Sequence, residues 1–285
     1  MPLIAVPTTA GTGSESTTIC VLDVLEANVK TGISHASLRP RLAVIDPQLT
    51  MTQPAGVTAA AGMDILCHAL ESYTAKPYTE FAAKRAEERV PYCGANPISD
   101  MWSREAVRLL ATSFRTAVAD GDDVDARGAM ALAATFAGMG FGNAGVHVPH
   151  ACAYPIAGMV RDFRPDGYDA DHPMVPHGMA VAMTAPAAFA LLYPTDPGRH
   201  HEMAALLEPD TAGSDLGRDA LPDALRRLMR DIGLPNGLVA LGYSPNDLPQ
   251  LVDGAMKQQR LLATAPVDIT ETDVERVLRD SMTLW

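Results

Sequence analysis

The pattern of apolar and polar positions changes character near residue 54 of this chain. Before it, short apolar runs bounded by Pro, Gly or polar residues predict strands at residues 3–6, 17–24 and 42–45. After it, apolar residues recur at helical spacing as far as the C-terminus. The pattern predicts helices over residues 55–75, 100–119, 123–139, 143–157, 178–193, 199–207, 216–231, 246–258 and 271–283. Clusters of Gly and Pro predict loops over residues 91–97, 164–176 and 234–245.

Two of these helices carry additional sequence signals. The last one begins with Thr270 and Asp273 in a capping-box pattern. The longest apolar run, residues 178–194, approaches the length of a membrane span. Because it contains Pro186 and directly follows His177, we predict that it is a buried core helix and not a membrane span.

The order of elements predicts an uneven two-part fold. Three short strands make a poor sheet by themselves. We therefore predict that residues 1–50 are the C-terminal end of an α/β domain whose beginning is absent. Residues 51–285 are predicted to form a large all-helical domain.

Composition excludes several classes of partner and location. The 34 acidic residues outnumber the 22 basic ones, and the formal net charge is −12. Since no long Lys/Arg block interrupts this excess, we expect no nucleic-acid or membrane partner. The four cysteines form no CxxC pair, which favours a reducing compartment. The N-terminus lacks the features of a signal peptide, so we expect a cytoplasmic protein, with an organellar matrix as the alternative.

The stretch GMDILCHALESY places Asp64 and His68 four residues apart in a helix-favouring run. Residues at this spacing lie on one helix face, so a carboxylate and an imidazole point into the same space. Neighbouring apolar residues indicate that this face is buried, where both groups need a partner. The simplest interpretation is a hydrogen bond between them. The alternative is that both bind a divalent metal together with residues from elsewhere in the chain.

Further imidazoles come from two later segments. They are His147 and His150, and then His172 and His177. An Asp with several imidazoles suits Fe(II), Zn(II) or another first-row divalent ion, and affinity order alone does not choose iron over zinc. Spacing does not decide which histidine of each pair binds metal, and each could instead make a structural hydrogen bond. His200 and His201 begin a polar helix and are expected at the surface.

The segment TTAGTGSESTT, residues 8–18, is dense in Gly and hydroxyl side chains. Such a loop can bring backbone N–H groups and hydroxyls close to a phosphate or a ribose. It matches neither the GxGxxG fingerprint nor a P-loop, since no Lys follows Gly13. Taken alone, the segment is more typical of a flexible loop than of a nucleotide site.

An ordered set of segments resembles one known family. In chain order they are PLIAVPTTAGTGSE, IDPQLT, GMDILCHALESY, GFGNAGVHVPHACAYP and VPHG. Together they are similar to the iron-containing (group III) alcohol dehydrogenases over essentially the whole chain. Further details look like one branch of that family, the hydroxyacid-oxoacid transhydrogenases: YCGANPISDMW, FAGMGFGNAGVH and YDADHPMVPHG.

The resemblance implies that residues 1–50 are the residual part of a dinucleotide-binding domain and that residues 51–285 form the metal-binding, catalytic domain. It also implies roles for individual residues. As metal ligands it implies Asp64, His68, His150 and His177. As the lining of a nicotinamide dinucleotide it implies Thr8, Thr9, Gly11, Thr12 and Gly13. It leaves His147 and His172 as supporting or packing residues. The implied cofactors are a divalent metal, with Fe(II) first and Zn(II) as the alternative, and NAD(H).

Two departures from the family pattern bear on function. Dehydrogenases of this family carry a second His four residues after the first one in the HACAYP segment, where this chain has Tyr154. A phenol with a pKa of about 10 is a poorer base at pH 7 than an imidazole, and a Tyr here matches the transhydrogenase branch. In addition, the family's Gly-Gly-Gly-Ser pyrophosphate turn has no counterpart before Met1, which bears on cofactor binding.

The resemblance implies hydride transfer between two small acids through bound NAD(H). The donor would be a hydroxyacid such as 4-hydroxybutyrate, and the acceptor a 2-oxoacid such as 2-oxoglutarate. A substrate carboxylate requires a cation, for which Arg161, Arg164 and Arg260 are candidates.

Two alternative functions remain open at this stage. One is an NAD-dependent alcohol dehydrogenase of the same family. The other is an inactive, truncated metal-binding fragment that pairs with another chain. A homo-oligomer is compatible with either alternative.

Overall fold

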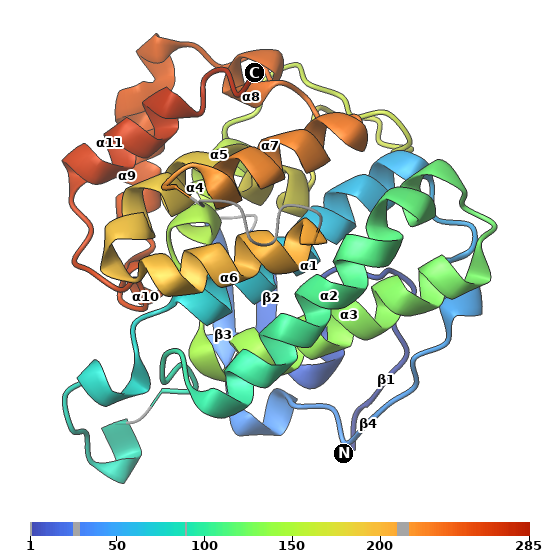
Figure 1. Ribbon diagram of the computed structural model, residues 1–285, viewed down its shortest axis with the longest axis horizontal. Helices are drawn as coiled ribbons and strands as arrows, with labels where there is room; N and C mark the ends of the chain where they lie inside the picture. Colours follow the sequence, from blue (N-terminus) through green and yellow to red (C-terminus); the bar gives the residue numbers. More distant parts are fainter. Residues whose placement is uncertain (1, 25–28, 89, 210–216) are drawn as a thin grey trace.

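A computed structural model of the chain describes residues 2–24, 29–88, 90–209 and 217–285. Over these ranges a small part with strands leads into a much larger helical part, which confirms the predicted fold class (Figure 1). The division between residues 50 and 51 stays a prediction.

Among the described residues, the helical part contains both long and very short helices. They are α1 (Ala55–Thr74), α2 (Pro97–Ala119), α3 (Val124–Ala144), α4 (Val148–Gly158), α5 (His177–Leu192), α6 (Pro197–Leu207), α7 (Ala220–Asp231), α8 (Gly237–Ala240), α9 (Leu248–Met256), α10 (Gln259–Leu262) and α11 (Glu271–Asp280). The predicted capping box of α11 is confirmed, with Thr270 accepting from Asp273 N. The predicted start of α7 at residue 216 lies outside the described residues. The short helices α8 and α10 were not predicted, and α8 interrupts the predicted loop at 234–245.

Four strands form two small sheets in the described part of the chain. They are β1 (Ile4–Ala5), β2 (Ile19–Val24), β3 (Val29–Ser34) and β4 (Leu42–Ala43). β1 pairs with β4 in parallel, and β2 pairs with β3 in antiparallel fashion, with Ile19 opposite Ser34. The apolar pattern missed β3 because Lys30, Thr31 and Gly32 interrupt its apolar positions. Its strand structure comes from pairing with β2, a non-local interaction.

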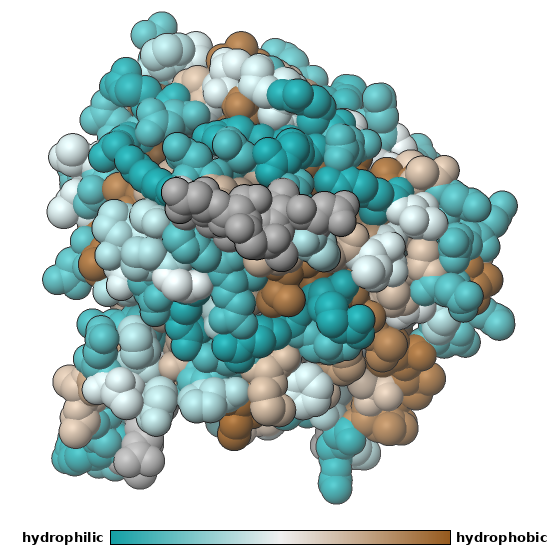
Figure 2. All heavy atoms as spheres, viewed as in Figure 1, coloured by the Kyte–Doolittle hydropathy of each residue, from teal (hydrophilic) through white to brown (hydrophobic). Residues whose placement is uncertain are grey.

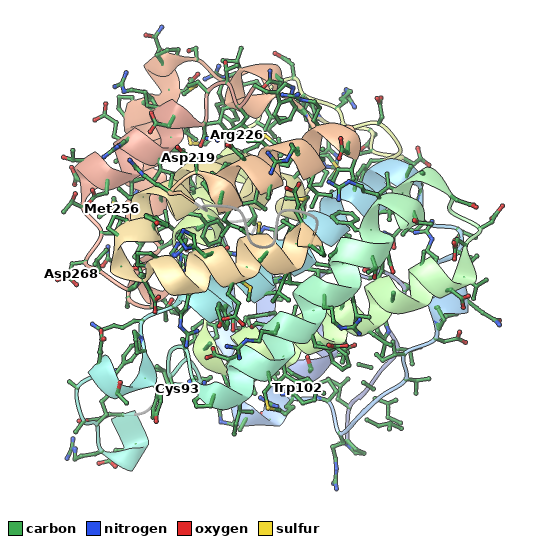
Figure 3. All side chains as sticks on the ribbon, in the orientation of Figure 1. Cys93, Trp102, Asp219, Arg226, Met256 and Asp268 are labelled. Atoms are coloured by element: carbon green, nitrogen blue, oxygen red, sulfur yellow. The ribbon has the colours of Figure 1, made fainter. Side chains whose placement is uncertain are left out.

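Helix α1 is the centre of the core and packs against α2, α3, α5 and α6. It is buried from Thr58 to Thr74 except at Ala61, which suits a helix that is apolar nearly all round. In Figure 1, α6 and α7 lie across one side of this core, and α2 and α3 run beside each other. Trp102 of α2, labelled in Figure 3, contacts Phe136 of α3 with ring centroids 5.2 Å apart.

The surface is uneven in hydropathy. On the face shown in Figure 2, hydrophilic residues predominate, and brown apolar residues gather at the end that carries β1 and β4. Exposed side chains of these strands and their flanks are Leu3, Ile4, Val6, Leu42 and Val44. Parallel strands are normally covered on both faces, so this pair is unusual in its exposure.

Helix α5 is a core helix, as predicted. Within the described residues, the segment His177–Thr195 is long and apolar enough to cross a membrane by length and composition, and α3 and α4, bent by 107°, pass that test only as a pair. However, 72% of the tested window in His177–Thr195 is buried inside the protein. Burial among neighbouring helices accounts for its apolar character.

The predicted break between residues 139 and 143 was wrong, because α3 continues to Ala144. Its glycines serve close packing and do not end the helix. A Cβ at Gly138 would lie 2.3 Å from Ser16 Oγ and 2.4 Å from Gly13 O, so the glycine lets the N-terminal loop rest on α3. The helix ends at Gly145, whose φ of 96° favours glycine.

The prediction that His200 lies at the surface was also wrong. Its side chain is buried, and its Nδ1 lies 2.9 Å from the carbonyl oxygen of Asp196. The ring packs edge-on against Phe189 of α5. The polar start of α6 concealed this contact, which only the packing of α6 on the core creates.

Gly178 sets how closely α5 approaches α1. A Cβ at this position would lie 2.1 Å from Ala60 O and 2.7 Å from Asp64 Cβ. We expect Gly178→Ala to lower the free energy of unfolding by about 1–3 kcal/mol, the usual range for overpacking, because neither α1 backbone nor Asp64 can move freely. Urea unfolding of the metal-free protein measures this change.

The matched control for that variant is Gly158→Ala, because a Cβ at Gly158 meets nothing within 4 Å. The midpoint of urea unfolding should be the same in the control as in the wild type. If Gly178→Ala behaves like this control, the close approach of the two helices is not required.

Candidate metal centre

Helix α1 supplies three acidic or imidazole side chains on one buried stripe. Asp64, His68 and Glu71 are 3%, 5% and 0% exposed. Their spacing of four and then three residues keeps them on one helix face. Glu71 was not predicted as a site residue, although its spacing from His68 in GMDILCHALESY is a signal that could have identified it.

Two further helices bring imidazoles to Asp64. The Nε2 atoms of His150, from α4, and His177, from α5, lie 3.5 and 3.8 Å from Asp64 Oδ1. One ligand atom from each of these three residues lies within 4.8 Å of the others. The structure therefore brings together three of the four predicted ligands, from distant parts of the chain.

The donor atoms in this cluster fit a divalent metal ion. Asp64 Oδ1 and His150 Nε2 are buried and have no hydrogen-bond partner among the described residues. A buried polar atom without a partner costs about 1–3 kcal/mol, so such atoms call for a ligand. One carboxylate with imidazoles is a donor set that iron and zinc accept. The side chain of His177 is 41% exposed, which leaves the cluster open on that side.

His68, the fourth predicted ligand, lies beside this group and not within it. Its Nδ1 is 3.8 Å from Asp64 Oδ2 and has no hydrogen-bond partner in the described structure. The ring is stacked between Phe141, at 4.0 Å, and His150, at 4.5 Å. This stacking fixes the plane of the imidazole. Its role as a ligand stays a prediction.

Glu71 holds the α4 histidines in place. Its Oε1 lies 2.6 Å from His150 Nδ1, and its Oε2 accepts a 2.6 Å hydrogen bond from His147 N. A carboxylate on one ring nitrogen orients the other ring nitrogen toward a metal. His147 is buried with its Nε2 3.1 Å from Thr74 Oγ1, whereas His172 is exposed and pairs with Asp171.

Burial and charge coupling act in opposite directions on the pKa values of the cluster. Burial acts to raise the pKa of Asp64 and Glu71, but the neighbouring imidazoles hold both below their usual ranges. Burial acts to lower the pKa of His150, yet Glu71 and Asp64 together raise it to about 9. For His68, burial prevails and lowers the pKa to about 3. In the metal-free protein at pH 7, His150 therefore carries the proton that balances the carboxylates.

Tyr154 and Arg260 lie next to the cluster. The Tyr154 ring contacts His177 edge-on, with centroids 6.2 Å apart. Burial raises the pKa of this phenol, and Arg260 opposes that rise. Arg260 also lies over the ring of Tyr92, with the guanidinium carbon 5.5 Å from the ring centroid. Sequence analysis gave no role to Tyr92.

The predicted cofactor loop is anchored by its small residues. Ala10, Gly11 and Gly13 are buried, and a Cβ at Gly13 would lie 2.4 Å from Ala134 O of α3. Glu15, also buried, accepts a 2.7 Å hydrogen bond from Thr135 Oγ1. Of the loop's threonines, Thr8, Thr9 and Thr12 are exposed, whereas Thr17 and Thr18 are buried.

A buried carboxylate surrounded by imidazoles at the meeting of three core helices defines a metal-dependent class of enzyme. The chain belongs to the iron-containing alcohol dehydrogenase family. Residues 58–282 match the model described as "Fe-containing alcohol dehydrogenase family, C-terminal", and residues 1–47 match "Iron-containing alcohol dehydrogenase".

Within this family, sequence similarity lies with the hydroxyacid-oxoacid transhydrogenase branch. The human (Homo sapiens) protein described as a mitochondrial hydroxyacid-oxoacid transhydrogenase is 45% identical over 100% of this chain. The chain spans 62% of the length of that relative.

Solved structures of the family share the fold. A 1,3-propanediol oxidoreductase superimposes with a TM-score of 0.82 and 33% identity, covering 98% of this chain and 66% of that one. A sulfoacetaldehyde reductase from Bifidobacterium kashiwanohense, solved with NAD+, gives a TM-score of 0.78 and 29% identity, covering 98% and 64%.

We expect the purified wild-type protein to hold about one divalent ion per chain, and Asp64→Ala or His150→Ala to hold almost none, because each removes a donor from a site of few ligands. Elemental analysis by mass spectrometry after gel filtration measures the content. His172→Ala, at an exposed imidazole outside the cluster, should retain the metal. Full metal retention in both cluster variants would refute the ligand assignment.

Metal affinity should rise with pH up to about pH 9. The folded-state pKa of His150, about 9, exceeds its unfolded value of about 6.5. The His150 proton therefore stabilises the metal-free fold below pH 6.5, and this contribution is lost as the pH rises to about 9. Because the metal displaces that proton, affinity increases across the same window, by up to about 10-fold per pH unit.

Glu71→Gln tests this origin of the pH dependence. It removes the charge that raises the pKa of His150, so the rise in affinity between pH 6.5 and 9 should flatten. Affinity at pH 9 should also fall by about 10- to 100-fold. Glu202→Gln, in a solvent-exposed ion pair with Arg104, is the control. Competition titration with a chelator measures the metal affinity of each variant and its dependence on pH. If the affinity of Glu71→Gln rises with pH as steeply as that of the wild type, the mechanism is contradicted.

Proposed function

We propose that this chain carries the metal-binding catalytic part of a hydroxyacid-oxoacid transhydrogenase. The observation that carries the proposal is the convergence of Asp64, His150 and His177 on one point at the meeting of α1, α4 and α5. The branch of the family to which the chain is similar supports the choice of reaction.

The proposed metal ligands are Asp64, His150 and His177, with His68 as the fourth. A divalent ion held there would act as a Lewis acid toward the substrate hydroxyl and would stabilise the developing negative charge by several kcal/mol. Glu71 keeps His150 oriented, and stacking on Phe141 keeps the His68 ring in place.

Tyr154 distinguishes the two enzymatic alternatives. Its raised pKa keeps the phenol protonated at pH 7, so it can donate a hydrogen bond but is a poor acceptor for the alcohol proton. The alcohol proton has to leave in either reaction, but dehydrogenases of the family carry a His at this position and the transhydrogenase branch carries a Tyr. This residue therefore favours transhydrogenation over an NAD-dependent alcohol dehydrogenase.

For the cofactor, we propose that NAD(H) binds on the exposed side of the loop, at Thr8, Thr9 and Thr12. Gly11 and Gly13, predicted from the same segment, pack inward against α1 and α3 and so hold the loop that presents these threonines. The sulfoacetaldehyde reductase solved with NAD+ supports this choice of cofactor. For substrates, we propose 4-hydroxybutyrate as the hydride donor and 2-oxoglutarate as the acceptor. The mitochondrial description of the relative supports an organellar matrix as the alternative to the cytoplasm.

A two-substrate assay on metal-loaded protein tests this function. We expect 2-hydroxyglutarate, measured by mass spectrometry, only when 4-hydroxybutyrate and 2-oxoglutarate are both present. Tyr154→His should raise turnover with 4-hydroxybutyrate and free NAD by about 10- to 100-fold. This increase does not exceed the smallest rate effects that are typical of general-base catalysis. Tyr78→His, at an exposed phenol away from the cluster, is the control.

Other outcomes of this assay identify the alternatives. Steady turnover of the wild type with NAD and a single alcohol would indicate an alcohol dehydrogenase. Full metal occupancy with neither turnover nor NAD binding would indicate the inactive metal-binding fragment.

A further inference from the structure

Of the three arginines suited to a substrate carboxylate, two are already engaged elsewhere. Arg161 forms an ion pair with Asp247. Arg164 donates a 3.1 Å hydrogen bond to the carbonyl oxygen of Ala170. Among the residues that the structure describes, no carboxylate lies within ion-pair distance of Arg260. Its guanidinium charge is exposed and lacks an acidic partner there.

Arg260 stands where three parts of the chain meet. It belongs to α10, which packs against α4, the helix that carries His150 and Tyr154. Its guanidinium covers Tyr92, which precedes Cys93 (labelled in Figure 3) in the segment between α1 and α2. The third part of the chain is β3 (Figure 1). A Cβ at Gly32 of this strand would lie 3.0 Å from Arg260 Nη2.

Tyr154 connects this arginine to the metal centre. Its ring lies against His177, one of the three converging residues. The side chain of Arg260 also interacts with its phenol. Tyr154 therefore links Arg260 to the open, His177 side of the cluster.

We infer that Arg260 binds the carboxylate of the substrate whose reacting carbon lies at the Asp64–His150–His177 cluster. This inference rests on the proposed function. A guanidinium presents parallel N–H donors to a carboxylate, and contact with an aromatic face restricts its orientations before the substrate binds. Gly32 contributes by leaving room for the guanidinium beside β3.

The same arginine serves both half-reactions. In 4-hydroxybutyrate the carboxylate is separated from the carbinol carbon by two methylene groups. In 2-oxoglutarate the distal carboxylate is separated from the keto carbon by the same two groups. One cation at a fixed place beside the metal centre therefore aligns donor and acceptor in turn. The substrate class is acids with this spacing.

Isothermal titration calorimetry of the metal-loaded protein tests the inference without requiring turnover. The probes are 4-hydroxybutyrate with 1-butanol as its neutral counterpart, and 2-oxoglutarate with 2-oxopentanoate, which lacks the distal carboxylate. Arg260→Ala should weaken binding of both acids by about 10- to 100-fold, as expected for one charge-assisted pair, and should leave the two counterparts unchanged. Arg260→Lys should restore part of the loss.

Arg164→Ala is the matched control, since it removes another exposed arginine. The affinity of this variant for both acids should equal that of the wild type. Metal content and thermal unfolding of Arg260→Ala should equal those of the wild type, which separates a binding role from a structural one. Unchanged acid binding in Arg260→Ala, or a wild type that binds neither acid more tightly than its counterpart, would overturn the inference.

Failure of the proposed function gives a different result. If the metal-loaded protein does not exchange hydride between the two acids, but Arg260→Ala still abolishes the preference for them, the function is wrong and the carboxylate site stands. If exchange occurs and KM for both acids is the same in Arg260→Ala as in the wild type, the function stands and the carboxylate site is wrong.

Discussion

Two carboxylates buried on one stripe of α1 impose the main constraint on this structure. Asp64 and Glu71 lie one above the other in the core, where isolated charges are costly. His150 lies between them, with Nδ1 on Glu71 and Nε2 on Asp64. Contact of α4 with α1 therefore helps to offset the cost of burying these carboxylates. The same contact contributes both to the stability of the core and to the geometry of the metal centre.

Exposure increases outward from this centre. Glu71, His147 and the His68–Phe141 stack are enclosed in the core, on the inner side of the site. His177 and Tyr154 are partly exposed, and Arg260 is exposed. An enclosed inner side suits the positioning of a reacting carbon, whereas an open outer side suits the exchange of one small acid for another. This arrangement is compatible with the transhydrogenation that we propose.

The N-terminal part depends on the helical part for its conformation. The loop at residues 8–18 is held by the hydrogen bond of Thr135 to Glu15 and by the glycine contacts with α3. β1 and β4 form only a short parallel pair with exposed apolar side chains. The chain spans 62% of the length of its human relative. The exposed side of the described loop carries threonine side chains, and its buried side rests on α3.

The sequence by itself determined the class of the fold, most of the helices and the residue types of the site, because periodicity and i, i+4 spacing act locally. It also indicated the family, through the order of its motifs. It did not determine the extent of α3, the burial of His200 or the pairing of β3, since each depends on a neighbour distant in the chain. Spacing left His147 and His150 undecided, and the family resemblance favoured His150. Only the tertiary structure revealed Glu71 as their common partner and placed Arg260 beside Tyr154. Those contacts depend on distances between helices, which no local pattern encodes.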